Sequence, residues 1–338
     1  MDLDLARTLR PFYGVHHPGL CNLRCFYCYE DHGSVDRDRV RAAIEAGLRR
    51  AARAGYRDVF FESGELLLLP FWREVLRLAR RLRFEQIGLV TNLTLLDERN
   101  VAELAAAGLD VVAGTFFALS DAGGRRVAGR PGVFTRQRRA VELVTRQPGL
   151  RLIPHLMLTR ETVRRPLASV RALQALVGPA ARSLIVSAVE PVSEAVLRHP
   201  AFIHGLDLDW EELIAAAERV GVFLVVQNVP ACALGRYAHR SLLIRKRVGR
   251  LLEGWPADPE LVRVVVEAES LRGRVEPTGL CRSCRLLPVC QRFYDYPVKR
   301  RRPGLGAVGV LRNLLAEERL EADAGALAAE LRRLELRR

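Results

Sequence analysis

The chain has no run of eighteen consecutive apolar residues, which argues against a hydrophobic transmembrane helix. Its first residues, MDLDLARTLR, also lack the apolar core of a secretory signal peptide. We therefore expect a cytoplasmic protein without membrane contact. In a reducing compartment, the seven cysteines are expected to be metal ligands or reactive thiols rather than disulfides.

Lysine is nearly absent, since it occurs only at Lys246 and Lys299. The formal net charge of +14 therefore comes almost entirely from arginine. Such a charge is compatible with an anionic partner such as RNA. However, the arginines are spread over many Arg-Ala-Leu helical segments, which favours a compositional bias over a binding surface. The KRRR run at 299–302 is interpreted as a solvated turn, so nucleic acid is the less favoured partner.

Apolar strand segments alternate with amphipathic helical segments up to Glu190. This alternation predicts a parallel sheet with right-handed crossovers. Six such units fit a partial (β/α) barrel or an open doubly wound sheet, and the periodicity alone does not separate the two. The expected strands are 12–15, 57–62, 86–92, 110–117, 151–158 and 183–190, and the expected helices are 35–55, 70–82, 97–108, 134–144 and 166–177.

Beyond Glu190 the alternation loosens, although a helix at 209–221 and a strand at 222–228 are still expected. From Pro230 to Pro303 cysteine, glycine and proline dominate the sequence. The last stretch, from Gly306, is expected to form one or two charged amphipathic helices. These changes predict three parts, namely a barrel domain at 1–230, a cysteine-rich region at 231–303 and a helical segment at 304–338.

Three cysteines, Cys21, Cys25 and Cys28, follow directly after the first expected strand. The carboxyl end of a parallel strand is where α/β folds build their sites. Thiolates at spacings of four and three can converge on one cuboidal iron–sulfur cluster, and three ligands leave one iron open for a substrate or cofactor. The alternative is a zinc site that borrows a fourth ligand. The candidates for that ligand are His16, His17 and His32.

The segment CNLRCFYC resembles the CxxxCxxC signature of the radical S-adenosylmethionine (radical SAM) enzymes, including an aromatic residue, Tyr27, before the third cysteine. The resemblance implies a partial (β/α)6 TIM-like barrel over roughly residues 10–230. It implies a [4Fe–4S] cluster whose open iron binds S-adenosylmethionine. One electron from an external reductant of the flavodoxin or ferredoxin type would then yield a 5′-deoxyadenosyl radical, which abstracts a substrate hydrogen.

The second expected strand ends in SGEL, which resembles the GGEP stretch of the same family. Gly64 and Glu65 match the pattern, whereas Ser63 replaces its first glycine and Leu66 replaces its proline. A glycine allows close backbone approach to a ligand. The resemblance therefore implies that backbone groups here, with Glu65, hold the methionine ammonium of the cofactor. The alternative is an ordinary turn between a strand and a helix.

Strand ends further along the chain carry weaker matches. GLVTNLTLL resembles the family's TNG-type end of strand three, with Leu93 in place of the glycine and Asn92 expected to face the ligand. Thr115 occupies the place where the family often has a group near the ribose. For His155, as for the other residues at these strand ends, a purely structural role is the alternative to a functional one. The resemblance thus implies cofactor binding by Tyr27, Ser63, Gly64, Glu65, Asn92, Thr115 and Met157, and catalytic roles for Glu65 and Glu190.

The remaining four cysteines all follow the expected barrel, at Cys232, Cys281, Cys284 and Cys290. Their spacing resembles the auxiliary-cluster region of the SPASM and Twitch subfamilies. A full SPASM domain has a further cysteine shortly after the last one, but here only Tyr294 lies in that stretch, so the Twitch-like arrangement matches better. The resemblance implies a second, auxiliary [4Fe–4S] cluster, with a structural zinc as the alternative.

The two cysteine groups together use all seven thiols. A cluster with four protein ligands cannot bind substrate through an open iron, so its expected task is to accept an electron from a substrate radical. No thiol remains to return a hydrogen atom, which favours net oxidation, such as dehydrogenation or cross-linking in peptide or protein maturation, over epimerisation. The alternatives are a small-molecule, nucleotide or tRNA substrate, and a non-catalytic iron–sulfur or zinc protein for electron transfer or scaffolding.

Overall fold

The structure is a computed structural model, and it describes residues 10, 12–16, 20–28, 36–178, 183–190, 193–252, 284–290 and 305–336. The chain divides into two compact units. The N-terminal unit comprises the described residues of Phe12–Ile185 and Val189–Ile203, and the C-terminal unit comprises Arg10, Val186–Ala188 and the described residues from His204 onward. Within these described parts of the chain, no helix is both long and apolar enough to cross a membrane.

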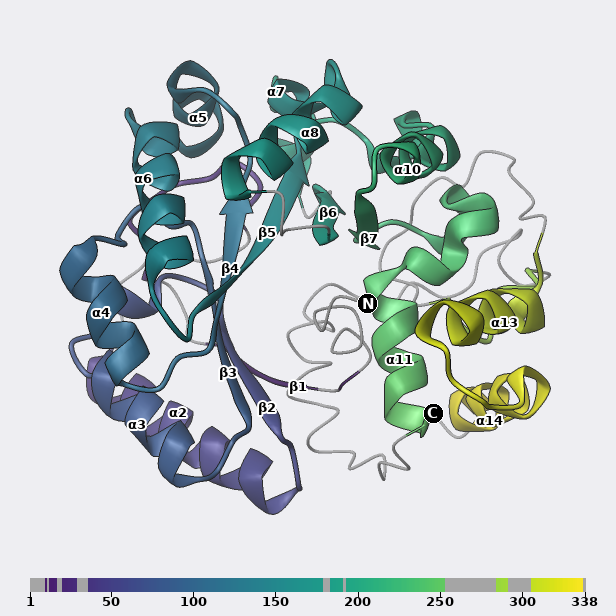
Figure 1. Cartoon of the computed structure of the whole chain (residues 1–338), viewed down its shortest axis with the longest axis horizontal. Helices are drawn as coiled ribbons and strands as arrows, with labels where there is room; N and C mark the ends of the chain where they lie inside the picture. The colour runs from purple at the N-terminus through teal and green to yellow at the C-terminus, as the bar shows by residue number, and fades with distance from the viewer. Residues whose placement is uncertain are drawn as a thin grey trace. The chain divides into compact units, whose positions relative to one another are not determined.

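The sheet has its seven strands in chain order, from β1 to β7 (Figure 1). Each of the first four strands pairs with the next in parallel. A doubly wound sheet reverses its strand order at a switch point, whereas this order runs on without reversal. The prediction of a partial, TIM-like barrel is therefore confirmed. The strands are β1 (Phe12–His16), β2 (Asp58–Glu62), β3 (Gln86–Thr91), β4 (Val111–Phe116), β5 (Arg151–Leu158), β6 (Ser183–Ala188) and β7 (Phe223–Gln227).

Helices follow the strands of the N-terminal unit, as the alternation predicts. The side chain of Asp36 caps the first helix by accepting from the backbone N–H groups of Asp38 and Arg39. Helix α8 begins at Pro166, a favoured first helical residue. The helices of this unit are α2 (Arg37–Arg53), α3 (Trp72–Arg81), α4 (Glu98–Ala106), α5 (Asp121–Ala128), α6 (Val133–Arg146), α7 (Arg160–Val163), α8 (Pro166–Val177) and α9 (Glu194–Arg198).

Side chains of each strand point alternately to the helices and to the inner, concave face. On β1, Tyr13 and Val15 are buried, and a Cβ added to Gly47 of α2 would lie 2.8 Å from the Tyr13 hydroxyl, so this face packs on the helix. By the same alternation, Gly14 and His16 belong to the inner face. Most of the candidate residues lie at the carboxyl ends of β1 to β5 or just beyond them.

The C-terminal unit begins with η2 (Gly205–Asp207) and α10 (Trp210–Arg219), which lead into β7. It continues through η3 (Ala231–Ala233), η4 (Gly235–Arg240) and α11 (Leu242–Leu252). The predicted helical character of the last stretch is confirmed as two helices, α13 (Ala307–Glu318) and α14 (Ala324–Leu336).

Candidate functional site

The cysteine loop at residues 20–28 is anchored on the end of helix α5. Arg24 and Phe26 donate backbone hydrogen bonds to the carbonyls of Ala128 and Val127, at 3.2 and 3.0 Å. Leu23, which is 1% exposed, packs into a core cluster with Val127 and its neighbours. The loop is therefore held by both backbone and side-chain contacts.

Aromatic residues of the loop pack against the ends of later strands. The ring of Phe26 stacks on that of His199, with centroids 4.0 Å apart and an interplanar angle of 5°. Tyr27 meets Phe117 edge-on at 6.3 Å. Phe26, Tyr27 and Met157 of β5 all pack against the buried cluster of Val189, Val196 and Phe202. Tyr27 and Met157, two of the expected cofactor-binding residues, therefore border the same hydrophobic cluster.

The three thiols of the loop form no disulfide with any described cysteine and are half-buried. The backbone N–H of Leu23 donates to Cys21 Sγ at 3.4 Å. Burial raises the pKa of Cys21 to about 11, and burial with the neighbouring charges of Cys28 and Cys21 raises the pKa of Cys25. Thiolates in such a place need a positive partner, and a metal group coordinated by sulfur supplies one.

No three His, Cys, Asp or Glu side chains within the described ranges lie close enough together to hold a single metal ion. A cuboidal cluster instead takes each thiolate on a different iron. Three soft thiol donors on one anchored loop, one of them receiving an N–H···S hydrogen bond, have the ligand chemistry of such a cluster.

The turn after β2 is joined to the cysteine loop through Glu65. Its backbone N–H donates to the carbonyl of Leu20 at 2.6 Å. Its carboxylate is buried and accepts from Thr91 Oγ1 at 2.7 Å and from the backbone N–H of Asn92 at 2.6 Å. Burial raises the pKa of Glu65 to about 7, although both hydrogen bonds oppose this. Glu65 thus connects the ends of β1, β2 and β3.

Two positions where the sequence departs from the family's glycines adopt left-handed backbone conformations. Ser63 has a φ of 70° and Leu93 has a φ of 67°. Side chains other than glycine rarely adopt this region, because Cβ then crowds the backbone. The chain therefore keeps the turn geometry at both strand ends while carrying a side chain there. Ser63 uses its own side chain, since its Oγ lies 2.8 Å from His16 Nδ1.

Asn92, at the end of β3, lies beside the first cysteine. Its Nδ2 is 3.6 Å from Cys21 Sγ and donates to Asn22 Oδ1 at 3.0 Å. Its Oδ1 accepts from the backbone N–H of Thr94 at 2.9 Å, and Asn22 Nδ2 donates to Thr94 Oγ1 at 2.7 Å. The structure places Asn92 beside Cys21, and its contact with a ligand stays a prediction.

Three contributors to this site were missed by sequence reasoning, namely Asn22, Thr94 and Gln137. The first two lie inside motifs that were recognised for other residues. Gln137 is fully buried on α6, where its Nε2 donates to the carbonyls of Asn92 at 3.2 Å and Thr115 at 2.9 Å. It therefore fixes the ends of β3 and β4 together, and a single glutamine in an amphipathic helix gives no signal of that role.

The remaining strand-end candidates occupy β4, β5 and the segment after β6. Thr115 and His155 are register partners on neighbouring strands. Burial lowers the pKa of His155 to about 4, so this imidazole is neutral near pH 7. Glu190 is buried just beyond β6. The functional roles of Thr115, His155 and Glu190 stay predictions.

The later cysteines are described in part, because Cys281 lies outside the described residues. Cys232 is on η3, and Cys284 and Cys290 bracket a turn whose Leu286 is fully buried. The backbone N–H of Leu286 donates to Cys284 Sγ at 3.4 Å, as that of Leu23 does to Cys21. His17, His32, Tyr294 and the 299–302 run also lie outside the described residues.

Parts of this chain are similar in sequence to known proteins. The family described as Radical SAM superfamily matches residues 15–167. The PqqA peptide cyclase of Gluconobacter oxydans is 32% identical over 150 residues, which cover 43% of this chain and 40% of that protein. The GTP 3′,8-cyclase of Rhodopirellula baltica is 31% identical over 119 residues, which cover 33% of each chain. The chain therefore spans less than half the length of these curated relatives.

Solved structures show the same fold at lower identity. The structure of anSMEcpe with bound AdoMet has a TM-score of 0.51 and 19% identity, and the match covers 73% of this chain and 69% of that one. Streptococcus suis SuiB bound to S-adenosylmethionine has a TM-score of 0.50 and 16% identity, with 64% and 51% covered. The match to the Radical SAM superfamily is confined to residues 15–167, and the solved structures share the fold of this chain.

Proposed function

We propose that the protein is a radical SAM enzyme that cleaves S-adenosylmethionine reductively and removes a hydrogen atom from its substrate. One observation carries this proposal, the meeting of three motifs that are far apart in the sequence. The cysteine loop contacts Asn92 at the end of β3, and both are tied to Glu65 of the SGEL turn. An ordinary strand-to-helix turn would not need a buried carboxylate that binds the end of a neighbouring strand.

In this proposal Cys21, Cys25 and Cys28 hold a [4Fe–4S] cluster. When bound, the cluster with S-adenosylmethionine supplies the 5′-deoxyadenosyl radical. The protein itself positions the cofactor and the substrate and excludes water from them. The Glu65 carboxylate already accepts from Thr91 and Asn92, so we assign it the positioning of the β3 end. A direct contact between Glu65 and the cofactor ammonium stays a prediction.

For the second cysteine group, we propose an auxiliary [4Fe–4S] cluster on Cys232, Cys281, Cys284 and Cys290, as in Twitch-like proteins. Such a group supplies an electron acceptor, which suits net oxidation of the substrate. The substrate would lose one hydrogen atom to the radical, then one electron to this acceptor and one proton to solvent. The predicted cytoplasmic location and the flavodoxin- or ferredoxin-type reductant belong to the same proposal.

A peptide is the substrate class that we favour, because the relative from Gluconobacter oxydans is by name a peptide cyclase. The similarity to a GTP 3′,8-cyclase makes a nucleotide the second candidate. Incubating the reconstituted enzyme with candidate peptides or with GTP, and measuring the mass of the product, separates the two. Net oxidation predicts a product lighter than its substrate by two hydrogens.

Electron paramagnetic resonance (EPR) of the anaerobically reconstituted, dithionite-reduced protein tests the first site. We expect a cluster signal that changes when S-adenosylmethionine is added, and its loss in Cys28→Ala. An EPR signal that does not change when S-adenosylmethionine is added would contradict the proposal and favour an electron carrier. The second site is tested by Cys232→Ala, which should lower the iron content while leaving the cofactor-sensitive signal. Unchanged iron in that variant would contradict the auxiliary cluster.

A further inference from the structure

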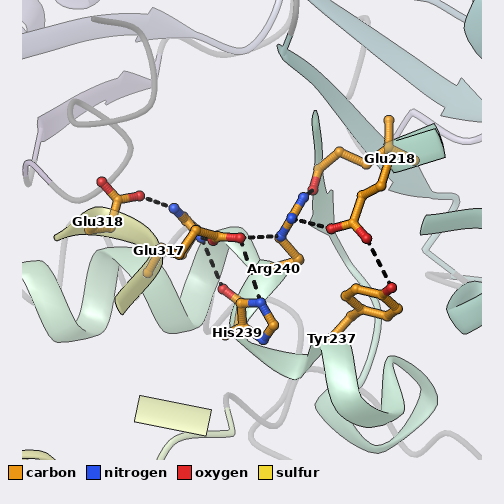
Figure 2. Close-up of polar contacts among 8 residues, drawn as sticks. Glu218, Tyr237, His239, Arg240, Glu317 and Glu318 are labelled. Carbon is orange, nitrogen blue, oxygen red and sulfur yellow. Dashed lines mark hydrogen bonds and ion pairs between the residues drawn. The ribbon is translucent and has the colours of Figure 1, made fainter. Parts of the chain in front are cut away.

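The C-terminal unit contains a cluster of buried ionic side chains that the proposed chemistry does not use (Figure 2). Arg245 of α11 is fully buried, and its Nη1 lies 2.6 Å from Glu317 Oε2 and 3.2 Å from the carbonyl oxygen of His239. Its Nη2 pairs with Glu318. One guanidinium of α11 therefore contacts two carboxylates of α13 and the backbone of η4.

Arg240, the last residue of η4, extends this cluster to β7 and α10. Its Nε lies 2.7 Å from Glu317 Oε1, and its Nη2 lies 2.5 Å from Glu218 Oε1. Its guanidinium carbon is 3.6 Å from the ring centroid of Phe223, the first residue of β7. Tyr237 completes the arrangement by donating its hydroxyl to Glu218 at 3.0 Å.

The cluster fixes the relative positions of the elements that it joins more than it stabilises the fold. Burial raises the pKa of Glu317, but His239, Arg245 and Arg240 outweigh it and lower the pKa to about 2. Buried ion pairs often stabilise no better than apolar residues of similar volume, because desolvation offsets their attraction. A planar guanidinium does, however, require its partners at fixed positions. The cluster therefore holds α13 in one register on α11 and η4.

The elements joined by this cluster are those that carry the described later cysteines. Cys232 lies on η3, which packs on η4. The carbonyl of Cys290 accepts from Arg247 Nη1 of α11 at 3.4 Å. The carbonyl of Arg285 accepts from the N–H of Ala307, the first residue of α13, at 3.0 Å. Both cysteine segments are thus attached to elements whose relative positions the ionic cluster sets.

We propose that Arg240, Arg245, Glu317 and Glu318 form an ionic clamp that pre-positions the Cys232 and Cys284–Cys290 segments for a shared thiolate-bound metal group, with Arg247 as the positioning residue at Cys290. The inference rests on the proposed second site. It adds that the protein, rather than the metal, sets the spacing of these segments. The N–H···S hydrogen bond from Leu286 to Cys284 fits this view, because a backbone group of the protein orients this thiol.

The test compares Glu317→Gln with Glu212→Gln in the full chain. The first change removes one charge from the clamp at nearly constant volume, and the second removes an exposed partner of Arg219 on α10. Iron and zinc per chain, EPR spectra and circular dichroism are measured after the same reconstitution. We expect wild type and Glu212→Gln to hold two metal groups, and Glu317→Gln to remain folded and keep only the cofactor-sensitive one. Zinc in place of the second portion of iron would overturn the proposed auxiliary [4Fe–4S] cluster, and its loss in Glu317→Gln would still support the clamp.

Full second-site occupancy in folded Glu317→Gln would overturn the clamp and leave the proposed function standing. Metal at the first site alone in wild type would overturn both the auxiliary site and the clamp. If Glu317→Gln does not fold, Arg247→Gln and Arg247→Lys decide. We expect the second metal group of Arg247→Gln to be lost to a chelator several-fold faster than in wild type, with Arg247→Lys restoring retention. Equal rates in all three proteins would overturn the inference.

Discussion

The side-chain amide of Asn92 donates to the Sγ atom of Cys21 across 3.6 Å, although the two residues are 71 positions apart in the chain. The contact exists because β3 ends beside the loop that follows β1. The backbone of Asn92 is in turn held by the buried carboxylate of Glu65. The end of β3 is thus part of the surroundings of Cys21.

Replacing Asn92 by alanine should weaken the first metal site. The amide donates towards Cys21 and orders Asn22 and Thr94, so its loss removes both an N–H···S contact and the packing of the loop. We expect several-fold faster loss of iron to a chelator. Asn100→Ala is the control, because that amide binds the carbonyl of Leu95 at 2.8 Å and is not bonded to the cysteine loop. Equal iron retention in both variants would refute a role for Asn92 at the site.

Two substitutions of Glu65 separate the effect of its side-chain shape from the effect of its charge. Glu65→Ala leaves the Asn92 N–H without its acceptor, which should lower the unfolding free energy by about 3 kcal/mol. Glu65→Gln can keep one acceptor and should cost about 1 kcal/mol. If Glu65 only positions β3, Glu65→Gln binds S-adenosylmethionine nearly as wild type does in calorimetry. A large loss of affinity would instead indicate direct contact with the cofactor.

The unfolding free energies of wild type and Glu65→Gln should depend differently on pH. The folded pKa of Glu65 is raised from 4.5 to about 7, so the folded state binds this proton more tightly than the unfolded state. Wild-type stability should therefore fall as pH rises from about 4.5 to about 7, by an amount that Glu65→Gln lacks. Urea unfolding of the metal-free proteins across this range measures the difference. A constant difference between the two proteins would show that the Glu65 pKa is not raised.

Leu93 and Gly114 should be energetically coupled. A Cβ on Gly114 would lie 2.8 Å from Leu93 Cδ1 and 3.0 Å from its Cδ2, so Gly114→Ala overpacks the core at a cost of about 1–3 kcal/mol. Leu93→Ala removes those methyls and leaves a cavity, which costs about 2–5 kcal/mol. The double variant should be more stable than the sum predicts, by about 1 kcal/mol or more. Additive unfolding free energies would contradict the packing.

The ionic clamp should release α13 in acid. The folded pKa of Glu317 is lowered from 4.5 to about 2, so its stabilising effect is present above pH 4.5 and is lost as pH falls towards 2. By linkage this amounts to about 3 kcal/mol. Hydrogen exchange of the α13 amides between these pH values should show opening in wild type. In Glu317→Gln the helix should open equally at both ends of the range, and retained acid sensitivity there would point to another group.

Much of the fold was predictable from periodicity, and the misses have physical causes. The strand at 151–158 was predicted with the bounds that the structure gives, because leucine, isoleucine and methionine make up most of it. Helix α5 was missed because Gly123 and Gly124 lie at its centre and helices disfavour glycine. Helix α11 was missed because cysteine, glycine and proline on either side of it suggested irregular structure.

Prediction of the site depended on motifs, and groups joined only by folding escaped it. The spacing of the first three cysteines and the SGEL turn could be recognised directly. The left-handed conformation of Leu93 was not evident, since a leucine gives no sign of that backbone. The clamp could not be predicted because Arg245 and Glu317 are distant in sequence. The sequence also does not show which of its many arginines are buried.

Formation of 5′-deoxyadenosine tests the central claim most directly. The protein is reconstituted anaerobically with iron and sulfide, then incubated with S-adenosylmethionine and dithionite, and the nucleoside is quantified by chromatography. We predict that wild type accumulates 5′-deoxyadenosine and that Cys25→Ala stays at the level of the enzyme-free control. A wild-type protein that carries its first cluster and yet forms no 5′-deoxyadenosine would contradict the account, as would a Cys25→Ala variant as active as wild type.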